Sequence, residues 1–190
     1  MKTIAIFASG NGTNAQRIME YFSRSSQIKI SLILSNKNDA YVLERAKNFK
    51  VESYVFDKSA FYETNKIIDI LSDHNIDLIV LAGFLWLIPI SLINKYKDKI
   101  INIHPALLPK YGGKGMYGMR VHQAVLEAKE KESGISIHYV NEFYDDGKIV
   151  FQSKCKVYPS DSQETLAERI HKLEHKHFAP VIEKLLMGKL

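Results

Sequence analysis

The chain has 190 residues, of which 46% are hydrophobic and 25% charged, as in ordinary globular domains. Its single cysteine, Cys155, excludes an intrachain disulfide and a cysteine-based metal cluster, and it suits the reducing cytoplasm. The net charge of +5 comes from scattered lysines, and no apolar stretch approaches membrane-spanning length, so neither nucleic acid nor a membrane is an expected partner.

Strand and helix patterns alternate along the chain, judged by hydrophobic periodicity and turn residues. Strands are predicted at 3–8, 28–34, 51–56, 76–82, 100–103, 134–140 and 148–157. Helices are predicted at 14–22, 41–49, 60–72, 121–129 and 162–187. Ser162 or Asp161 is expected to cap the last helix.

These elements predict an α/β fold. The continuous apolar strand 76–82 is of the type buried on both faces of a parallel sheet. The strands 134–140 and 148–157 follow each other without an intervening helix, which indicates antiparallel pairing. We therefore expect one domain over residues 1–190. It has a Rossmann-like, mostly parallel central sheet with antiparallel additions in the C-terminal half.

A glycine-rich turn, Ser9-Gly-Asn-Gly-Thr-Asn14, connects the first strand to the first helix. Its glycines permit a tight turn that exposes the backbone amides of Gly12, Thr13 and Asn14 at a helix N-terminus, where an anion is stabilised. The acidic residue that NAD-binding folds place about 20 residues later is missing, which favours a monophosphate over NAD. The alternative is a plain strand-to-helix connection.

A second polar group lies at the end of the fifth predicted strand. Asn102 and His104 are two residues apart, so their side chains project from one face of the strand. Such a pair could stabilise an oxyanion, and Asp145, in a turn between two strands, could reach the imidazole and keep it protonated. Alternatively, His104 is a core histidine without a catalytic role, and the segment around Asp145 is a hairpin turn that needs only Asp146 and Gly147.

Two further segments bear on a site. Residues 111–118 contain four glycines, which predicts either a flexible lid or an ordinary surface loop. On the last helix, His171 and Glu174 are three residues apart and share a face. The histidines 171, 175 and 177 have no acidic or cysteine partner at ligand spacing, so no metal site is expected.

Four segments carry a family resemblance: Ser9 to Asn14, Leu81-Ala-Gly-Phe84, Asn102 to Tyr111 and Gly134 to Val150. Together they resemble the glycinamide ribonucleotide formyltransferases, and the resemblance covers almost the whole chain. It implies transfer of the formyl group of 10-formyltetrahydrofolate to the amine of 5-phosphoribosylglycinamide in de novo purine (IMP) biosynthesis. We further expect a cytoplasmic protein, either a monomer or a homodimer, whose reaction requires no metal.

The resemblance implies a catalytic trio of Asn102, His104 and Asp145. The Asn102 amide and a protonated His104 would donate hydrogen bonds to the oxyanion of a tetrahedral intermediate. Asp145 would hold His104 charged and accept the proton of the amine.

Two binding regions also follow from the resemblance. The substrate phosphate and ribose are expected at Gly12, Thr13, Asn14 and Glu174. The folate is expected at Asn102 and along the backbone of Leu85, Trp86, Leu87 and Ile88. The chain departs from the family pattern at Trp86, where family members often have Arg, and in a longer glycine-rich segment after Tyr111.

Alternative functions share the same core. Another 10-formyltetrahydrofolate-dependent formyltransferase would act on methionyl-tRNA or an amino sugar, and a formyltetrahydrofolate deformylase would transfer the formyl group to water. A nucleotide-binding module without chemistry is the alternative from a different class. An assay of formyl transfer to glycinamide ribonucleotide distinguishes these functions.

Overall fold

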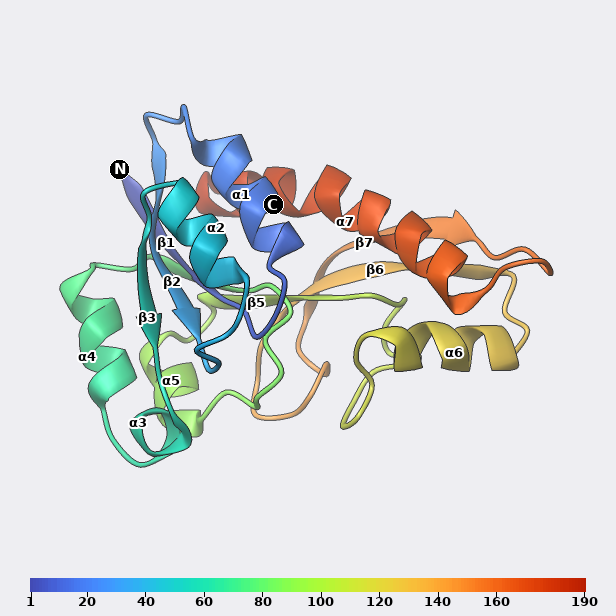
Figure 1. Cartoon of the computed structure of the whole chain (residues 1–190), viewed down its shortest axis with the longest axis horizontal. Coiled ribbons are helices and arrows are strands. Elements are labelled where there is room, and N and C mark those ends of the chain that lie inside the picture. The colour runs from blue at the N-terminus through green and yellow to red at the C-terminus, as the bar shows by residue number, and fades with distance from the viewer.

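The computed structural model describes residues 1–190 as one seven-stranded sheet with helices on both faces (Figure 1). The strands are β1 (Lys2–Phe7), β2 (Ile28–Ser35), β3 (Glu52–Val55), β4 (Leu78–Leu81), β5 (Ile100–His104), β6 (Glu132–Tyr139) and β7 (Ile149–Lys156). The helices are α1 (Thr13–Phe22), α2 (Val42–Asn48), α3 (Lys58–Tyr62), α4 (Lys66–Asp73), α5 (Ile90–Lys95), α6 (Met119–Glu127) and α7 (Gln163–Leu186).

The strand order is β3-β2-β1-β4-β5-β6-β7. Strands β1 to β5 pair parallel with one another, whereas β6 pairs antiparallel with both β5 and β7. This confirms the predicted fold class, a mostly parallel sheet with antiparallel strands in the C-terminal half. None of the helices combines the length and apolar character that crossing a membrane requires.

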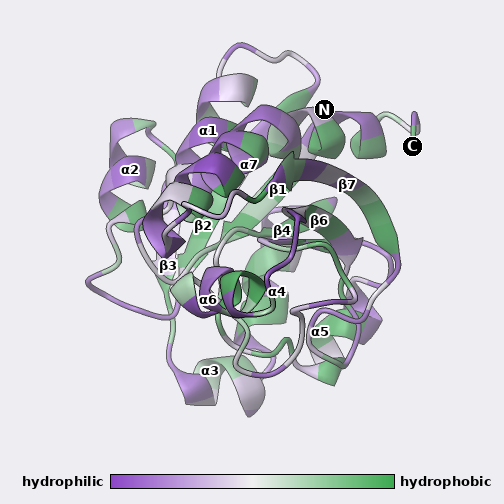
Figure 2. Cartoon of the chain, turned by 90° about the vertical axis from the view of Figure 1, so that its right-hand side faces the viewer, coloured by the Kyte–Doolittle hydropathy of each residue, from purple (hydrophilic) through white to green (hydrophobic).

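Two apolar cores lie on opposite faces of the sheet. Helices α1, α2, α6 and α7 cover one core, and α3, α4 and α5 cover the other. Figure 2 shows hydrophilic and hydrophobic residues alternating along the outer helices, as expected where one helix face packs on the sheet. The central strand β4 is buried throughout, because it is covered on both faces.

The predicted helix at 60–72 is two helices, so that prediction was wrong. Helix α3 begins after Asp57, whose carboxylate accepts a hydrogen bond from the Ala60 amide at 2.8 Å, and it ends at Tyr62. Helix α4 then starts at Lys66. The two helices turn separate apolar residues towards the core, Phe61 from α3 and Ile67 and Leu71 from α4. Helix α5, which follows Pro89, was not predicted.

The long C-terminal helix α7 begins as predicted after Ser162. The Ser162 hydroxyl accepts a hydrogen bond from the Thr165 amide, and the Thr165 hydroxyl accepts one from the Ser162 amide, so the two residues form a capping box. Helix α7 packs against α1, α6 and β6. The capping box therefore stabilises the start of a helix that packs against both neighbouring helices and the C-terminal part of the sheet.

Replacing Ser162 by Ala removes the acceptor for one free amide at the start of α7. We expect this to lower the free energy of unfolding by about 1 kcal/mol, measured by urea denaturation. Ser160→Ala, at an exposed position two residues earlier, is the matched control and should change it by less than about 0.5 kcal/mol. Equal losses in the two variants would show that the cap contributes nothing specific.

Candidate active site

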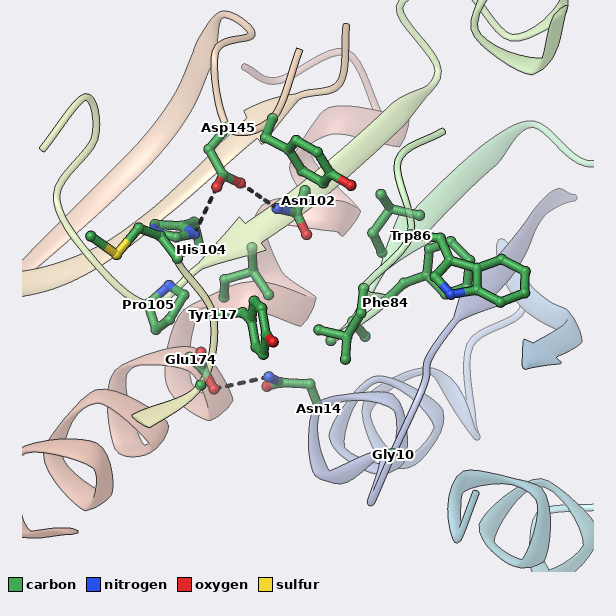
Figure 3. A pocket seen from close by; sticks show the side chains of 18 of the residues that line it. Gly10, Asn14, Phe84, Trp86, Asn102, His104, Pro105, Tyr117, Asp145 and Glu174 are labelled. Atoms are coloured by element: carbon green, nitrogen blue, oxygen red, sulfur yellow. Dashed lines mark hydrogen bonds and ion pairs between the residues drawn. The ribbon is translucent and has the colours of Figure 1, made fainter. Parts of the chain in front are cut away.

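A cavity of about 790 Å³ opens at the carboxyl ends of the parallel strands (Figure 3). Residues that follow β1, β4 and β5 line it, together with the turn before β7 and one face of α7. Strands β2 and β4 flank β1 on opposite sides, so the chain reverses direction across the sheet here. In open α/β sheets this switch point is where ligands bind.

One end of the cavity is the glycine-rich turn before α1. Gly12 has a φ of 72°, and a Cβ on it would lie 2.5 Å from the Val42 side chain, so a glycine is required for two separate reasons. The turn leads directly into α1 at Thr13, and Gly12, Thr13 and Asn14 all line the cavity. The helix N-terminus thus faces the cavity, which is the arrangement predicted for an anion site.

Helix α7 closes this end of the cavity with Glu174. The Asn14 amide donates a hydrogen bond to the Glu174 carboxyl at 2.9 Å, although the residues are far apart in sequence (Figure 3). Glu174 is only 6% exposed, and burial raises its pKa against the opposing effect of Asn14. His171 and His175 line the same wall, so the predicted shared face of His171 and Glu174 is towards the cavity.

The other end of the cavity is organised around Asp145. Its Oδ2 accepts a hydrogen bond from the Gly113 amide at 3.0 Å and lies 3.4 Å from Nδ1 of His104. Its Oδ1 accepts a hydrogen bond from Nδ2 of Asn102 at 3.3 Å. The three residues predicted as a catalytic trio therefore lie together (Figure 3).

The turn that carries Asp145 is held close to β6. A Cβ on Gly147 would lie 1.8 Å from the carbonyl oxygen of Tyr139, so only glycine allows this approach. Asp146 faces away and accepts a hydrogen bond from the Asn141 side chain. The tandem acids thus have separate partners, and Asp145 is the one directed at the imidazole.

Asp145 is ionised in this environment. Burial raises its pKa, but the His138 imidazole and the Gly113 amide outweigh that effect and leave the pKa below its ordinary value. The side chain is 11% exposed. A charged carboxylate therefore sits almost buried beside the cavity.

The protonation of His104 differs from the expectation that Asp145 keeps it charged. His104 is 3% exposed, and this burial lowers its pKa more than Asp145 and the Tyr111 carbonyl raise it. Near pH 7 the ring is therefore mainly neutral. Its Nε2 lies 2.7 Å from the Tyr111 carbonyl oxygen, which only accepts, so Nε2 carries the proton and Nδ1 is open beside Asp145.

Asn102 has a neighbour that was not predicted as a site residue. His138 on β6 places Nε2 3.1 Å from Nδ2 of Asn102 and 3.6 Å from Oδ1 of Asp145. Asn102 and His138 are direct partners across the β5–β6 pair. The alternation of strand 134–140 puts His138 on one face with Ser136, but only the register of β6 against β5 brings it to Asn102.

The segment after β4 forms a third wall. Leu85, Trp86, Leu87 and Ile88 all line the cavity, as expected for a binding segment. The Tyr62 hydroxyl donates a hydrogen bond to the Leu87 carbonyl at 3.0 Å, and Trp86 packs against the rings of Phe56, Phe61, Tyr62 and Phe84. Aromatic side chains thus hold the backbone of this segment in place along the cavity.

The glycine-rich segment 111–118 lies over the catalytic end. Residues 113–118 line the cavity, and the Gly113 amide donates a hydrogen bond to the Asp145 carboxylate. This position is the one expected of a lid. Elsewhere, Cys155 is a free thiol in β7, and no group of three or more His, Cys, Asp or Glu side chains is arranged to hold a metal ion.

Comparisons with known proteins agree with this arrangement. The formyl transferase family model matches residues 2–182. The chain is 41% identical over 187 residues to the phosphoribosylglycinamide formyltransferase, chloroplastic, of Arabidopsis thaliana, covering 95% of this chain but 64% of that relative. It is 39% identical over 193 residues to the phosphoribosylglycinamide formyltransferase of Bacillus subtilis, covering 98% of this chain and 95% of that relative.

A solved structure is also similar over the full length. The glycinamide ribonucleotide transformylase 1 of Geobacillus kaustophilus superimposes with a TM-score of 0.88 at 35% identity, covering 98% of this chain and 99% of that one. The fold of this chain is therefore shared, over its whole length, with a solved protein of this name.

His122 in α6 predicts a pH dependence of stability. The residue is 2% exposed, and burial lowers its pKa to about 4. The unfolded chain binds this proton near the ordinary pKa of 6.5, so the folded state should lose stability as the pH falls from 6.5 to about 4. The loss should reach about 1.4 kcal/mol per pH unit at its steepest.

Urea denaturation between pH 7 and 4 measures this loss, with His122→Gln as the reference that cannot titrate. The difference in unfolding free energy between the two proteins should change through this window. Parallel curves would mean that His122 titrates normally in the fold.

Proposed function

The chain belongs to the formyl transferase family, and on this basis we propose that it transfers the formyl group of 10-formyltetrahydrofolate to the amine of 5-phosphoribosylglycinamide. This is a step of de novo purine (IMP) biosynthesis. The observation that carries the proposal is the cavity itself. It joins a helix N-terminus suited to a phosphate with the cluster of Asn102, His104 and Asp145.

The acceptor substrate fits the cavity by charge and by shape. A phosphate at the amides of Gly12, Thr13 and Asn14 would meet the positive end of α1. The lysine and arginine at positions 114 and 120 line the same cavity and favour an anion. With the phosphate there, Glu174 and its partner Asn14 are placed to accept and donate hydrogen bonds to the ribose.

The formyl transferase family uses a folate-derived formyl donor, and the wall at 85–88 suits such a ring. Backbone groups can hydrogen-bond a flat heterocycle that presents both donors and acceptors, and Ile88 is buried beneath the segment. Trp86 faces the aromatic cluster instead of presenting a charge to the cavity. We propose that 10-formyltetrahydrofolate binds at Leu85, Trp86, Leu87 and Ile88 and reaches Asn102.

The residues at the catalytic end can move the proton that the reaction releases. As the amine attacks the formyl carbon, its nitrogen becomes acidic and its proton has to be removed. Nδ1 of His104 is open and lies beside the ionised Asp145, so it can take this proton, and the carboxylate stabilises the resulting imidazolium. The proton can then pass from His104 to the departing nitrogen of the folate.

The remaining assignments form part of the same proposal. The whole chain, residues 1–190, acts as one formyltransferase domain on small-molecule substrates, in the cytoplasm, as a monomer or homodimer. Neither nucleic acid nor a membrane takes part. A metal has no role in the steps above, since each proton transfer has a named side chain.

Substitutions at the catalytic end should reduce the rate of formyl transfer. His104→Ala and Asp145→Asn remove the proton acceptor and its stabilising charge, and we expect each to lower kcat by about 10²- to 10³-fold. Matched controls are His177→Ala and Asp146→Asn, which change the same residue types outside the cavity. Both controls should keep at least half of the wild-type rate.

The assay follows formylated ribonucleotide and free formate separately, starting from 10-formyltetrahydrofolate and 5-phosphoribosylglycinamide. Formate without formylated product would indicate a deformylase and overturn the proposed function. Near-wild-type transfer by His104→Ala would remove the proton-accepting role from that residue.

The segment 111–118 should become more ordered when both substrates bind. It leaves the catalytic strand directly, four of its residues are glycines, and residues 113–118 line the cavity. Hydrogen exchange of its amides should slow in the ternary complex formed with an unreactive folate analogue, while the turn at residues 23–27 serves as an unaffected reference. Unchanged exchange at 111–118 would mean that this segment is a static wall.

A further inference from the structure

Arg45 on helix α2 contacts the glycine-rich turn before α1 from outside the active-site cavity. Its Nε donates a hydrogen bond to the carbonyl oxygen of Asn11 at 2.7 Å, and its Nη2 donates one to Oδ1 of the same residue at 2.6 Å. Its Nη1 donates a third to the side-chain oxygen of Gln16 near the start of α1. Asn11 lines the cavity, whereas Arg45 does not. The function proposed above gives Arg45 no role.

The start of α2 also holds the residues on both sides of Asn11. The Val42 amide donates a hydrogen bond to the Gly10 carbonyl at 3.2 Å, and the Val42 side chain fills the space where a Cβ on Gly12 would lie. Glycines at positions 10 and 12 would otherwise leave this backbone free to adopt many conformations. Val42 limits that freedom at the two glycines, and Arg45 limits it at the residue between them.

The bond from Arg45 to the Asn11 carbonyl determines the direction of the next amide. The Asn11 carbonyl and the Gly12 N–H belong to one trans peptide group, so they point in opposite directions. Because a residue outside the cavity holds the carbonyl, the N–H is directed away from that residue and towards the cavity that Gly12 lines. This N–H donates to no acceptor within the protein, so it is available to a ligand.

The guanidinium of Arg45 is itself held in one orientation. Its Cζ lies 4.8 Å from the centroid of the Tyr41 ring, a favourable cation–π arrangement. Its planar fork of donors matches the two oxygens of Asn11, which a single ammonium group cannot bond in the same fixed geometry. A lysine at this position would therefore replace the charge but not the fork.

We propose that Arg45 is a positioning residue that holds the peptide between Asn11 and Gly12 with its N–H facing the cavity before the substrate phosphate binds. This rests on the proposed function, which puts that phosphate at the amides of Gly12, Thr13 and Asn14. A turn that is already ordered binds its ligand more tightly, because no further ordering has to accompany binding. Arg45 therefore acts on binding of the phosphorylated substrate, and neither folate binding nor the chemical step depends on it.

Binding of ribose 5-phosphate, followed by NMR of the backbone amides, tests this role without formyl transfer. In wild type the Gly12 amide signal should shift on binding. Arg45→Met keeps a long side chain without a donor and should weaken binding about tenfold, as expected when one residue becomes ordered only on binding. Lys47→Met removes a charge from an exposed position of the same helix and should change binding by less than about twofold.

Arg45→Lys separates the fork of donors from the charge. This variant should still bind ribose 5-phosphate at least about threefold more weakly than wild type, since an ammonium group cannot hold both oxygens of Asn11. The weakening in Arg45→Met should also persist at high salt, because salt screens a charge effect but not a positioning effect. Wild-type binding by Arg45→Lys, or a loss in Arg45→Met that disappears at high salt, would show a charge effect alone and overturn the proposal.

A double-variant cycle tests whether Arg45 acts through Asn11. Asn11→Ala removes one of the two oxygens from an exposed residue, so the fold should be unaffected. Adding Arg45→Met to Asn11→Ala should weaken binding less than the product of the two separate losses. Losses that simply multiply would show that Arg45 acts without Asn11 and would overturn the proposal.

Formyl transfer supplies a second readout. In Arg45→Met the KM for 5-phosphoribosylglycinamide should rise about tenfold, while kcat and the KM for 10-formyltetrahydrofolate stay within about twofold. A loss of kcat, or an equal rise in both KM values, would show a general structural role and overturn the proposal. Absence of formyl transfer by wild type would overturn the proposed function, whereas the ribose 5-phosphate titration would still decide the role of Arg45. No shift of the Gly12 amide in wild type would overturn that role whatever the activity.

Discussion

The candidate site depends on one nearly buried negative charge, the carboxylate of Asp145. Burial alone would favour its neutral form, but the His138 imidazole and the Gly113 backbone amide keep its pKa below the ordinary value. Because the carboxylate only accepts hydrogen bonds, it determines what its neighbours present to it. Asn102 must turn its NH2 group towards Asp145, and Nδ1 of His104 becomes the place where a further proton is stabilised.

The sheet explains why this charge can be held so closely. Strand β5 is the last of the parallel strands, and β6 returns antiparallel beside it, so His138 comes opposite Asn102. The turn after β6 then approaches the Tyr139 carbonyl, which Gly147 alone permits, and this places Asp145 over His104. A parallel strand in place of β6 would put neither residue there, which ties the antiparallel half of the sheet to the chemistry.

Much of this arrangement could be predicted from the sequence because the signals are local. The alternation of strands and helices identifies the fold, the spacing of Asn102 and His104 places them on one strand face, and the glycines before α1 mark its exposed amides. Properties that depend on contacts between residues far apart in the sequence were not predicted. His138 meets Asn102 only through strand register, and Asn14 meets Glu174 only because α7 crosses α1. The pKa of His104 depends on how deeply the fold buries the ring, and the presence of Asp145 in the sequence does not reveal this.

The central claim is that an ionised Asp145 lies beside a neutral His104 that is open at Nδ1. A ¹⁵N NMR titration of the histidine side chains of the substrate-free protein tests it most directly, with His104→Ala used to assign the signals. At pH 7 the His104 ring should be neutral with its proton on Nε2, and it should take a second proton at Nδ1 only as the pH falls below 6.5. A doubly protonated His104 at pH 7, or a neutral ring with its proton on Nδ1, would contradict the account.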